Sequence, residues 1–407
     1  MNPRVKNPLS RRPLMLAGAV AAMLFAGIIY AWSILKTPFA VQFAWGASEL
    51  ALNFTITMTF FCLGGFVGAK LTKRFGVKVT TICAGMLAAT GFMLTATING
   101  QNILMLYLTY GVLAGLGIGI AYNVVISAIN AWFPDKKGLC SGCLMMGFGA
   151  SSLVLGNLAS DCMVSIGWRK TFLFFGLALG IVLIITGMLL KRPDGSVIFP
   201  TGRSKKQAKA EDFETRDFET NQMLRRMSFW MAFLSIGLLA AVGSSVISFA
   251  RDLAMSVGAA GSLATTLVGV LSVCNGLGRI LTGILFDAKG RRFTMLSANI
   301  LTIGAAGVTL LAVVLHSLPL CIAGMCLVGM SYGSCPTVSS AFVSAFYGPK
   351  FFPTNFSIMN FNLIGSSLMA TACGSLLTFT GGYTAPFTVL LVLSVAALVL
   401  NLQLKKP

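Results

Sequence analysis

Charged side chains are scarce in this sequence, and acidic side chains and histidine are the scarcest. Only 10% of the 407 residues are charged, with 11 acidic residues and one histidine, whereas 56% are hydrophobic and the mean hydropathy is +0.85. Soluble domains carry about 25% charged residues, so this composition excludes an ordinary soluble protein. Paired carboxylates, metal-ligand clusters and a nucleophile beside a base are also missing, so we expect no enzyme activity, no cofactor and no metal.

Paired cysteines are almost absent as well. The chain has 10 cysteines, and only Cys140 and Cys143 form a CxxC pair. This pair stands at the start of an apolar stretch, with no second pair to complete a zinc site and no thioredoxin-like context. We therefore interpret the cysteines as small packing residues.

Long apolar stretches make up most of the chain. Windows of about 18 to 25 residues, long enough to span a bilayer as helices, are bounded by polar breaks. They cover residues 14–35, 48–71, 78–97, 102–127, 138–162, 170–190, 228–251, 262–286, 293–314, 318–341, 355–378 and 385–404. The sequence therefore predicts an all-α membrane protein with twelve transmembrane helices in two six-helix bundles, over residues 1–190 and 228–407. A polar linker, 191–227, joins the halves; its doubled DFET, at 212–215 and 217–220, is interpreted as coincidence.

Basic residues outnumber acidic ones, and their positions indicate topology. The net charge is +19, and most of the 30 lysines and arginines fall in the tails, the linker and the loops on one side of the predicted membrane. The positive-inside rule places that side, with both termini, in the cytoplasm. No basic domain remains to bind a nucleic acid. We expect a multi-pass protein of the plasma (inner) membrane that acts as a monomer within the lipid bilayer.

One arginine lies inside an apolar window. Arg279 is about 10 Å from one end of the predicted helix over 262–286. A guanidinium at that depth costs from a few to more than about 10 kcal/mol, so such residues usually face a watery cavity and bind an anion. The same helical face carries small or polar residues, namely Ser272, Asn275, Gly276 and Gly283. The alternative is that Arg279 extends its charged end to the nearer interface along its own apolar stem.

Tyrosines in three other windows could contribute to such a site. Tyr122 lies in the glycine-rich fourth window beside Asn123, and Tyr332 holds a similar place in the tenth. Polar groups at mid-membrane need partners, and a cavity provides them. Tyr30 belongs either to this cavity or to the aromatic belt at the membrane interface.

The second half repeats the pattern of the first. Residues 283–292 follow the eighth window as residues 71–78 follow the second, and 346–350 match the loop at Trp132. Two repeats of six spans, with polar groups near the midplane, are typical of secondary transporters with a site between the halves.

These residues resemble the major facilitator superfamily, and within it the oxalate/formate antiporter family and its monocarboxylate-transporter relatives. The stretch 283–292 fits the GxLxDxxGRR gating loop of the superfamily, through Gly283, Asp287, Gly290 and Arg291. The first-half copy departs from it, with Lys73 where an acidic residue is usual. Further matches are YAWS at 30–33, WFPDKKGL at 132–139 and MLRRMSFW at 223–230.

The resemblance implies the major facilitator fold, alternating access and a substrate-carboxylate role for Arg279, in NGLGRILTG. Oxalate-specialised members carry a second cation, a lysine, where this chain has Leu363 beside Asn362, and the relatives often have an acid where it has Asn275. One cation suits a monocarboxylate such as lactate, pyruvate or formate, because a second carboxylate would remain unpaired. We expect secondary active transport, as proton symport or anion exchange, with Arg279, Asn275, Tyr122, Tyr332 and Tyr30 binding the substrate. The alternatives are an oxalate or dicarboxylate exchanger and a sensor that binds a carboxylate without transporting it.

Overall fold

The computed structural model describes residues 12–45, 47–100, 102–191, 193 and 217–404. The first bundle contains α1 (Arg12–Ala26), the 3-10 helix η2 (Gly27–Ala31), α2 (Trp32–Leu35), α3 (Thr37–Phe43), α4 (Ala47–Thr95), α5 (Ile103–Leu106), the π-helix η3 (Tyr107–Ala114), α6 (Gly115–Trp132), α7 (Lys137–Ile166) and α8 (Trp168–Leu189). After the short α10 (Thr220–Leu224), the second bundle contains α11 (Met227–Ser256), α12 (Gly261–Val314), α13 (Leu318–Tyr347), α14 (Phe352–Met359), α15 (Asn362–Thr380) and α16 (Thr384–Leu402). The all-α prediction is confirmed.

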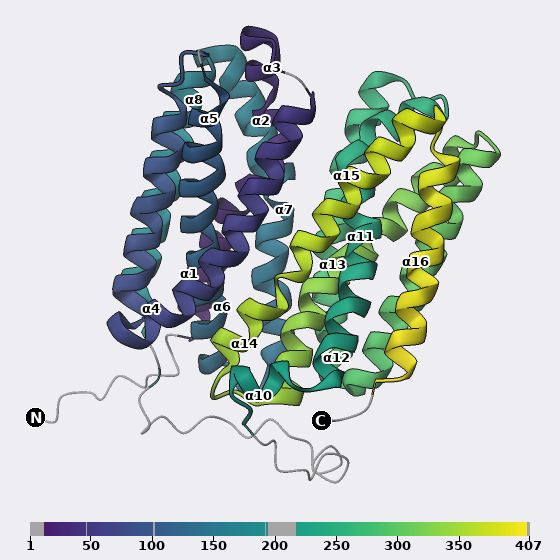
Figure 1. Cartoon of the computed structure of the whole chain (residues 1–407). Helices are drawn as coiled ribbons and strands as arrows, with labels where there is room; N and C mark the ends of the chain where they lie inside the picture. The colour runs from purple at the N-terminus through teal and green to yellow at the C-terminus, as the bar shows by residue number, and fades with distance from the viewer. Residues whose placement is uncertain (1–11, 46, 101, 192, 194–216, 405–407) are drawn as a thin grey trace, which may run out of the picture.

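The two bundles lie side by side and contact each other along a shared face (Figure 1). From the first bundle, α7 packs against α12 and α13, and α4 packs against α14 and α15. Helix α10 lies at the end of the bundles where α8 ends and α11 begins, which we call the linker side (Figure 1). Residues 192 and 194–216, which make up most of the expected linker 191–227, lie outside the described residues.

Two very long helices each contain two of the expected spans. Helix α4 has 49 residues and α12 has 54, about twice the roughly 20 residues that one transmembrane helix needs. Each is broken by a glycine in a conformation that other residues avoid, Gly76 (φ 78°, ψ 171°) and Gly290 (φ 74°, ψ −178°). The ten long apolar helices of the described residues thus provide twelve spans. The matching breaks fall in the loops that the sequence repeat predicted.

Two expected spans are interrupted in ways that the sequence did not predict. The first, 14–35, passes through η2, where the backbone of Gly27 lies against the main-chain oxygen of Phe148. The eleventh, 355–378, is divided into α14 and α15 around Asn360. The Sγ of Cys62, on α4, donates a hydrogen bond to the main-chain oxygen of Asn360 at 3.2 Å. Contacts with the other bundle thus lie at the point where this helix is interrupted.

Candidate functional site

Arg279 is buried where α12 meets α7, with 1% of its surface exposed. Its Nε donates to Oδ1 of Asn275, one turn earlier, at 3.0 Å, and its Nη1 donates to the main-chain oxygen of Met145 on α7 at 2.6 Å. The Nη2 atom has no hydrogen-bond partner. Arg279 has no ion-pair partner among the described residues, so no carboxylate there neutralises its charge. The result is a buried positive charge with a free donor between the two bundles.

Glycines on α7 make room for this arginine. A Cβ added at Gly149 would lie 2.9 Å from Nε and 3.0 Å from Cζ of Arg279, and one at Gly142 would lie 2.7 Å from its main-chain oxygen. All three distances are shorter than van der Waals contact, so neither position accepts a larger residue without movement. The hydroxyl of Thr337, on α13, donates to the same main-chain oxygen at 3.3 Å.

Tyr122 on α6 and Tyr332 on α13 lie near Arg279, and Tyr30 on η2 lies beside both tyrosines. The side chains of Tyr122 and Tyr332 are 5% and 6% exposed, and both interact electrostatically with Arg279 and with Tyr30. Phe148 joins two of the rings, with its centroid 5.1 Å from Tyr30 and 5.0 Å from Tyr122. The structure therefore brings together all five residues that the sequence singled out for substrate binding.

The linker side of this site is closed by contacts between the bundles. The ring of Phe356, on α14, stacks on Tyr122 with centroids 6.3 Å apart. Beside it, Nδ2 of Asn123 donates to the main-chain oxygen of Pro353 at 3.1 Å. Nearer to the linker, the hydroxyls of Ser141 and Ser340 lie 3.4 Å apart.

The expected gating loop also joins the bundles. The main-chain nitrogen of Leu139, in the first turn of α7, donates to Oδ2 of Asp287 at 3.0 Å. First-turn N–H groups lack partners within their own helix and carry partial positive charge, so a carboxylate stabilises this helix end. Gly290 makes the sharp turn, Gly283 is buried, and Arg291 lies over the Phe346 ring at 4.2 Å.

Lys73 makes a different contact at the matching position of the first half. Its Nζ lies 5.6 Å from the centre of the Phe351 ring, immediately before α14. A cation on an aromatic face therefore stands where the repeat would otherwise supply a carboxylate. The two halves close on the linker side with different chemistry.

The position that could have held a second cation is neutral. Asn362 is 4% exposed and its Nδ2 has no partner, while Leu363 is half-buried among apolar side chains. Among the described residues, no group of three or more histidine, cysteine or acidic side chains could hold a metal ion.

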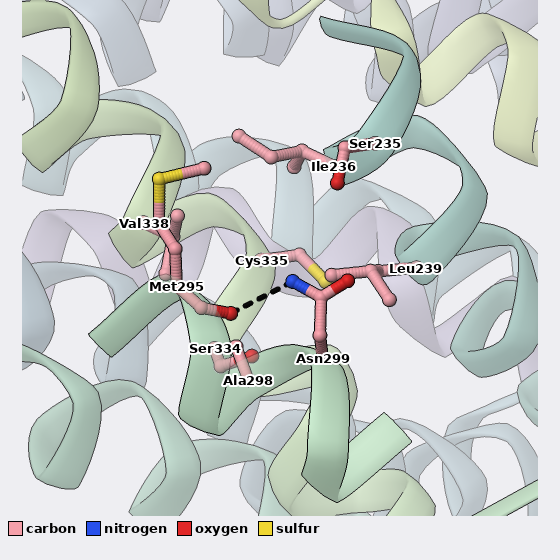
Figure 2. A pocket seen from close by; sticks show the side chains of 9 residues that line it. All are labelled: Ser235, Ile236, Leu239, Met295, Ala298, Asn299, Ser334, Cys335 and Val338. Atoms are coloured by element: carbon pink, nitrogen blue, oxygen red, sulfur yellow. Dashed lines mark hydrogen bonds between the residues drawn. The ribbon is translucent and has the colours of Figure 1, made fainter. Parts of the chain in front are cut away.

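A small separate cavity lies within the second bundle, lined by residues of α11, α12 and α13, among them Ser235, Asn299 and Cys335 (Figure 2). Nδ2 of Asn299 donates to the main-chain oxygen of Met295 at 2.7 Å, whereas its Oδ1 has no partner (Figure 2). The cavity has room for about one water molecule. The cavity is therefore too small for an organic anion.

Sequence reasoning missed the contribution of α7. No residue of the window 138–162 was expected at the site, although Gly149 borders the guanidinium and Phe148 lies against two tyrosines. The partner of Nη1 is a main-chain oxygen, Met145, and no side-chain pattern predicts such a group. The spacing of the small residues in 142–149 was the one available signal.

Comparisons with known proteins identify relatives among transporters. The chain is 29% identical over 282 residues to the uncharacterized MFS-type transporter YhjX of Escherichia coli, covering 69% of this chain and 67% of the relative. It is 28% identical over 294 residues to the oxalate:formate antiporter of Oxalobacter formigenes, covering 70% and 66%. Monocarboxylate transporter 12 of Mus musculus is 27% identical over 285 residues, but the match spans only 56% of its length.

Solved structures share the fold at low sequence identity. The proton:xylose symporter XylE superposes with a TM-score of 0.70 at 14% identity, covering 96% of this chain and 95% of that one. FucP in the outward conformation gives 0.69 at 12% identity, covering 96% and 99%. The family model of the Major Facilitator Superfamily matches residues 14–361. The chain belongs to the major facilitator superfamily and is a multi-pass membrane transporter.

Proposed function

We propose that this transporter carries a small monocarboxylate, of the lactate, pyruvate or formate type, by alternating access. The observation that carries the proposal is the buried Arg279, whose Nη2 is free and whose charge no described carboxylate neutralises. A buried unpaired charge is unfavourable, so an anionic ligand at this position would be strongly favoured. Two relatives, an oxalate:formate antiporter and a monocarboxylate transporter, support the class of substrate.

In this proposal, the carboxylate accepts a charge-assisted hydrogen bond from Nη2 of Arg279. A bidentate pair would also need Nη1, which already donates to the main-chain oxygen of Met145. Asn275 orients the guanidinium through its bond to Nε. The hydroxyls of Tyr122, Tyr332 and Tyr30, of which the last two bond to each other, would provide further polar contacts to the substrate. Substrate binding would neutralise the arginine and lower the cost of moving one bundle past the other.

The neutral surroundings favour a monoanion over a dianion. Asn362 and Leu363 occupy the region where a second cation would be needed, and neither carries charge. A second carboxylate buried without a partner would cost several kcal/mol. A dicarboxylate or oxalate exchanger is therefore the second candidate, and the free Nδ2 of Asn362 is the one observation that favours it.

The residues around Arg279 also bear on whether transport is coupled to a proton or to a second anion. The described spans place no histidine or carboxylate in contact with Arg279, so we infer either exchange of one anion for another or entry of a proton with the substrate. We place the linker side, with both termini, in the cytoplasm on the basis of its lysines and arginines. The protein would act as a monomer in the plasma membrane.

Counterflow in proteoliposomes tests the substrate class. Vesicles loaded with unlabelled lactate, pyruvate, formate or oxalate would receive a trace of the same labelled anion, with and without an inward proton gradient. Faster labelled uptake with one monocarboxylate than with oxalate is the expected result, and gradient dependence separates symport from exchange. Preferred uptake of oxalate would favour the dicarboxylate exchanger, and binding without any uptake would favour a sensor.

A further inference from the structure

The end of the linker is anchored to the second bundle by its own main chain and side chains. The segment Asp217–Thr220, which we call the linker clasp, lies across the end of α13 and the start of α14. The main-chain nitrogen of Phe218 donates to the main-chain oxygen of Tyr347 at 3.1 Å, and Oδ1 of Asp217 accepts from the main-chain nitrogen of Lys350 at 3.0 Å. Between them, Gly348 has a φ of 77° and no room for a Cβ beside the Asp217 carboxylate.

The ring of Phe218 is buried in this contact, with 6% of its surface exposed. It meets Tyr347 edge to face at 5.6 Å, and the guanidinium of Arg226 lies over it at 5.5 Å. The segment otherwise lies at the surface of the protein, so burial of this ring holds the segment in place. The first DFET copy, 212–215, lies outside the described residues.

Asn355, in the first turn of α14, connects the linker clasp to the gate. It is fully buried, its Nδ2 donates to the main-chain oxygen of Phe218 at 3.0 Å, and its Oδ1 accepts from the Thr220 hydroxyl at 2.9 Å. The next residue, Phe356, stacks on Tyr122 of the candidate site. Two residues before Asn355, Pro353 accepts the bond from Asn123 of the other bundle. One helical turn therefore bonds to the linker and also closes the site.

We propose that the linker clasp positions Phe356 and so holds the site closed on the linker side, with Asn355 and Thr220 as positioning residues. Release of the linker clasp would let α14 move away from α4 and α6 and would raise the population open on that side. The closure is a step of transport only under the proposed function, on which the inference rests in this respect. Its test uses no substrate. A linker that only tethers the halves would leave this equilibrium unchanged.

The reactivity of Cys62 reports on the closure. Its side chain is buried and bonds across the bundles to Asn360, so the closed arrangement shields it. In a variant that keeps Cys62 and replaces the other nine of the 10 cysteines by alanine, the rate of N-ethylmaleimide labelling follows the open population. We expect Thr220→Val to raise this rate about fivefold, since one lost hydrogen bond changes an equilibrium by about that factor, and Phe218→Ala to raise it further. Phe218→Leu should restore most of the protection.

Phe387→Ala is the matched control, because it removes another buried phenylalanine ring from α16, away from α14. Size-exclusion chromatography selects variants that remain folded, and Thr220→Val, which keeps the side-chain shape, provides a test even if Phe218→Ala unfolds. Labelling rates in Thr220→Val and Phe218→Ala that equal the parent rate would overturn the proposal. An equal rise in Phe387→Ala would also overturn it, since the effect would then be general loosening of the bundle.

Discussion

Arg279 reaches across the boundary between the two bundles and donates a hydrogen bond to the main-chain oxygen of Met145, 2.6 Å from its Nη1. The contact joins a charged side chain of the second bundle to the backbone of the first. It places the free Nη2 where a ligand would touch both halves. Movement of the bundles relative to each other would change this contact, so occupancy of the site and closure are expected to be coupled.

The space beside Arg279 is the first testable feature. Gly149→Ala would place a methyl group 2.9 Å from Nε and displace the guanidinium, so we expect transport to fall by about 10-fold or more. Gly156→Ala, two turns further along α7, would meet the flexible end of Ile34 at 3.0 Å and make ordinary contact with the Cβ of Ala31 at 3.5 Å, so it should transport normally. Initial uptake rates at matched protein levels measure both. Similar rates for the two variants would remove Gly149 from the site.

The charge at position 275 should set the coupling. Asn275→Asp keeps the shape of the side chain but places a carboxylate 3.0 Å from Nε, where it would neutralise Arg279 and compete with the substrate. We expect KM at pH 7 to rise by about 10-fold, and an inward proton gradient to lower it, because protonation of the aspartate frees the arginine. Asn275→Leu, which has no charge, should show no such gradient effect. An unchanged KM in Asn275→Asp would contradict this account.

The contact of Asp287 with α7 should be visible in local dynamics. Asp287→Ala removes the acceptor for the Leu139 N–H, so we expect the first turn of α7 to exchange its amide hydrogens about fivefold faster. Hydrogen–deuterium exchange read by mass spectrometry measures this directly. Asp161→Ala, which removes an exposed carboxylate near the other end of α7, is the control. Unchanged protection in Asp287→Ala would show that the bond contributes nothing to closure.

The unpaired oxygen of Asn299 predicts a stabilising substitution. A buried polar atom without a partner costs about 1–3 kcal/mol, so Asn299→Leu should raise the thermal midpoint by several degrees. Asn130→Leu should lower it, because Oδ1 of Asn130 accepts a bond from the Ser141 hydroxyl at 2.8 Å. Thermal scans in detergent compare the two. A lower midpoint for Asn299→Leu would indicate that a water molecule in the cavity satisfies the oxygen.

Much of the fold could be predicted because apolar windows and glycine breaks are local signals. Gly76 and Gly290 stand between paired windows, and the structure places sharp turns at both. The break at Asn360 and the 3-10 turn at Gly27 could not be predicted in this way. Asn360 contacts Cys62, and Gly27 contacts Phe148, each on another helix. Such contacts between distant parts of the chain leave no periodic pattern in the sequence.

The candidate site was predicted unevenly for a similar reason. Arg279 and Asn275 are four residues apart on one helix, so their bond follows from helical geometry. The tyrosines were identified as polar groups in apolar windows, although their convergence depends on how helices from both bundles pack together. Phe356, which closes the site, looks like any apolar residue of a membrane helix.

Uptake of a labelled monocarboxylate into proteoliposomes by the wild type and Arg279→Gln tests the central claim most directly. Arg225→Gln, at an exposed position outside the site and the gating loop, serves as the matched control. The account predicts that the wild type and Arg225→Gln accumulate the same monocarboxylate, and that Arg279→Gln loses uptake by about 100-fold or more. Normal uptake by folded Arg279→Gln would show that the arginine is structural and would contradict the account.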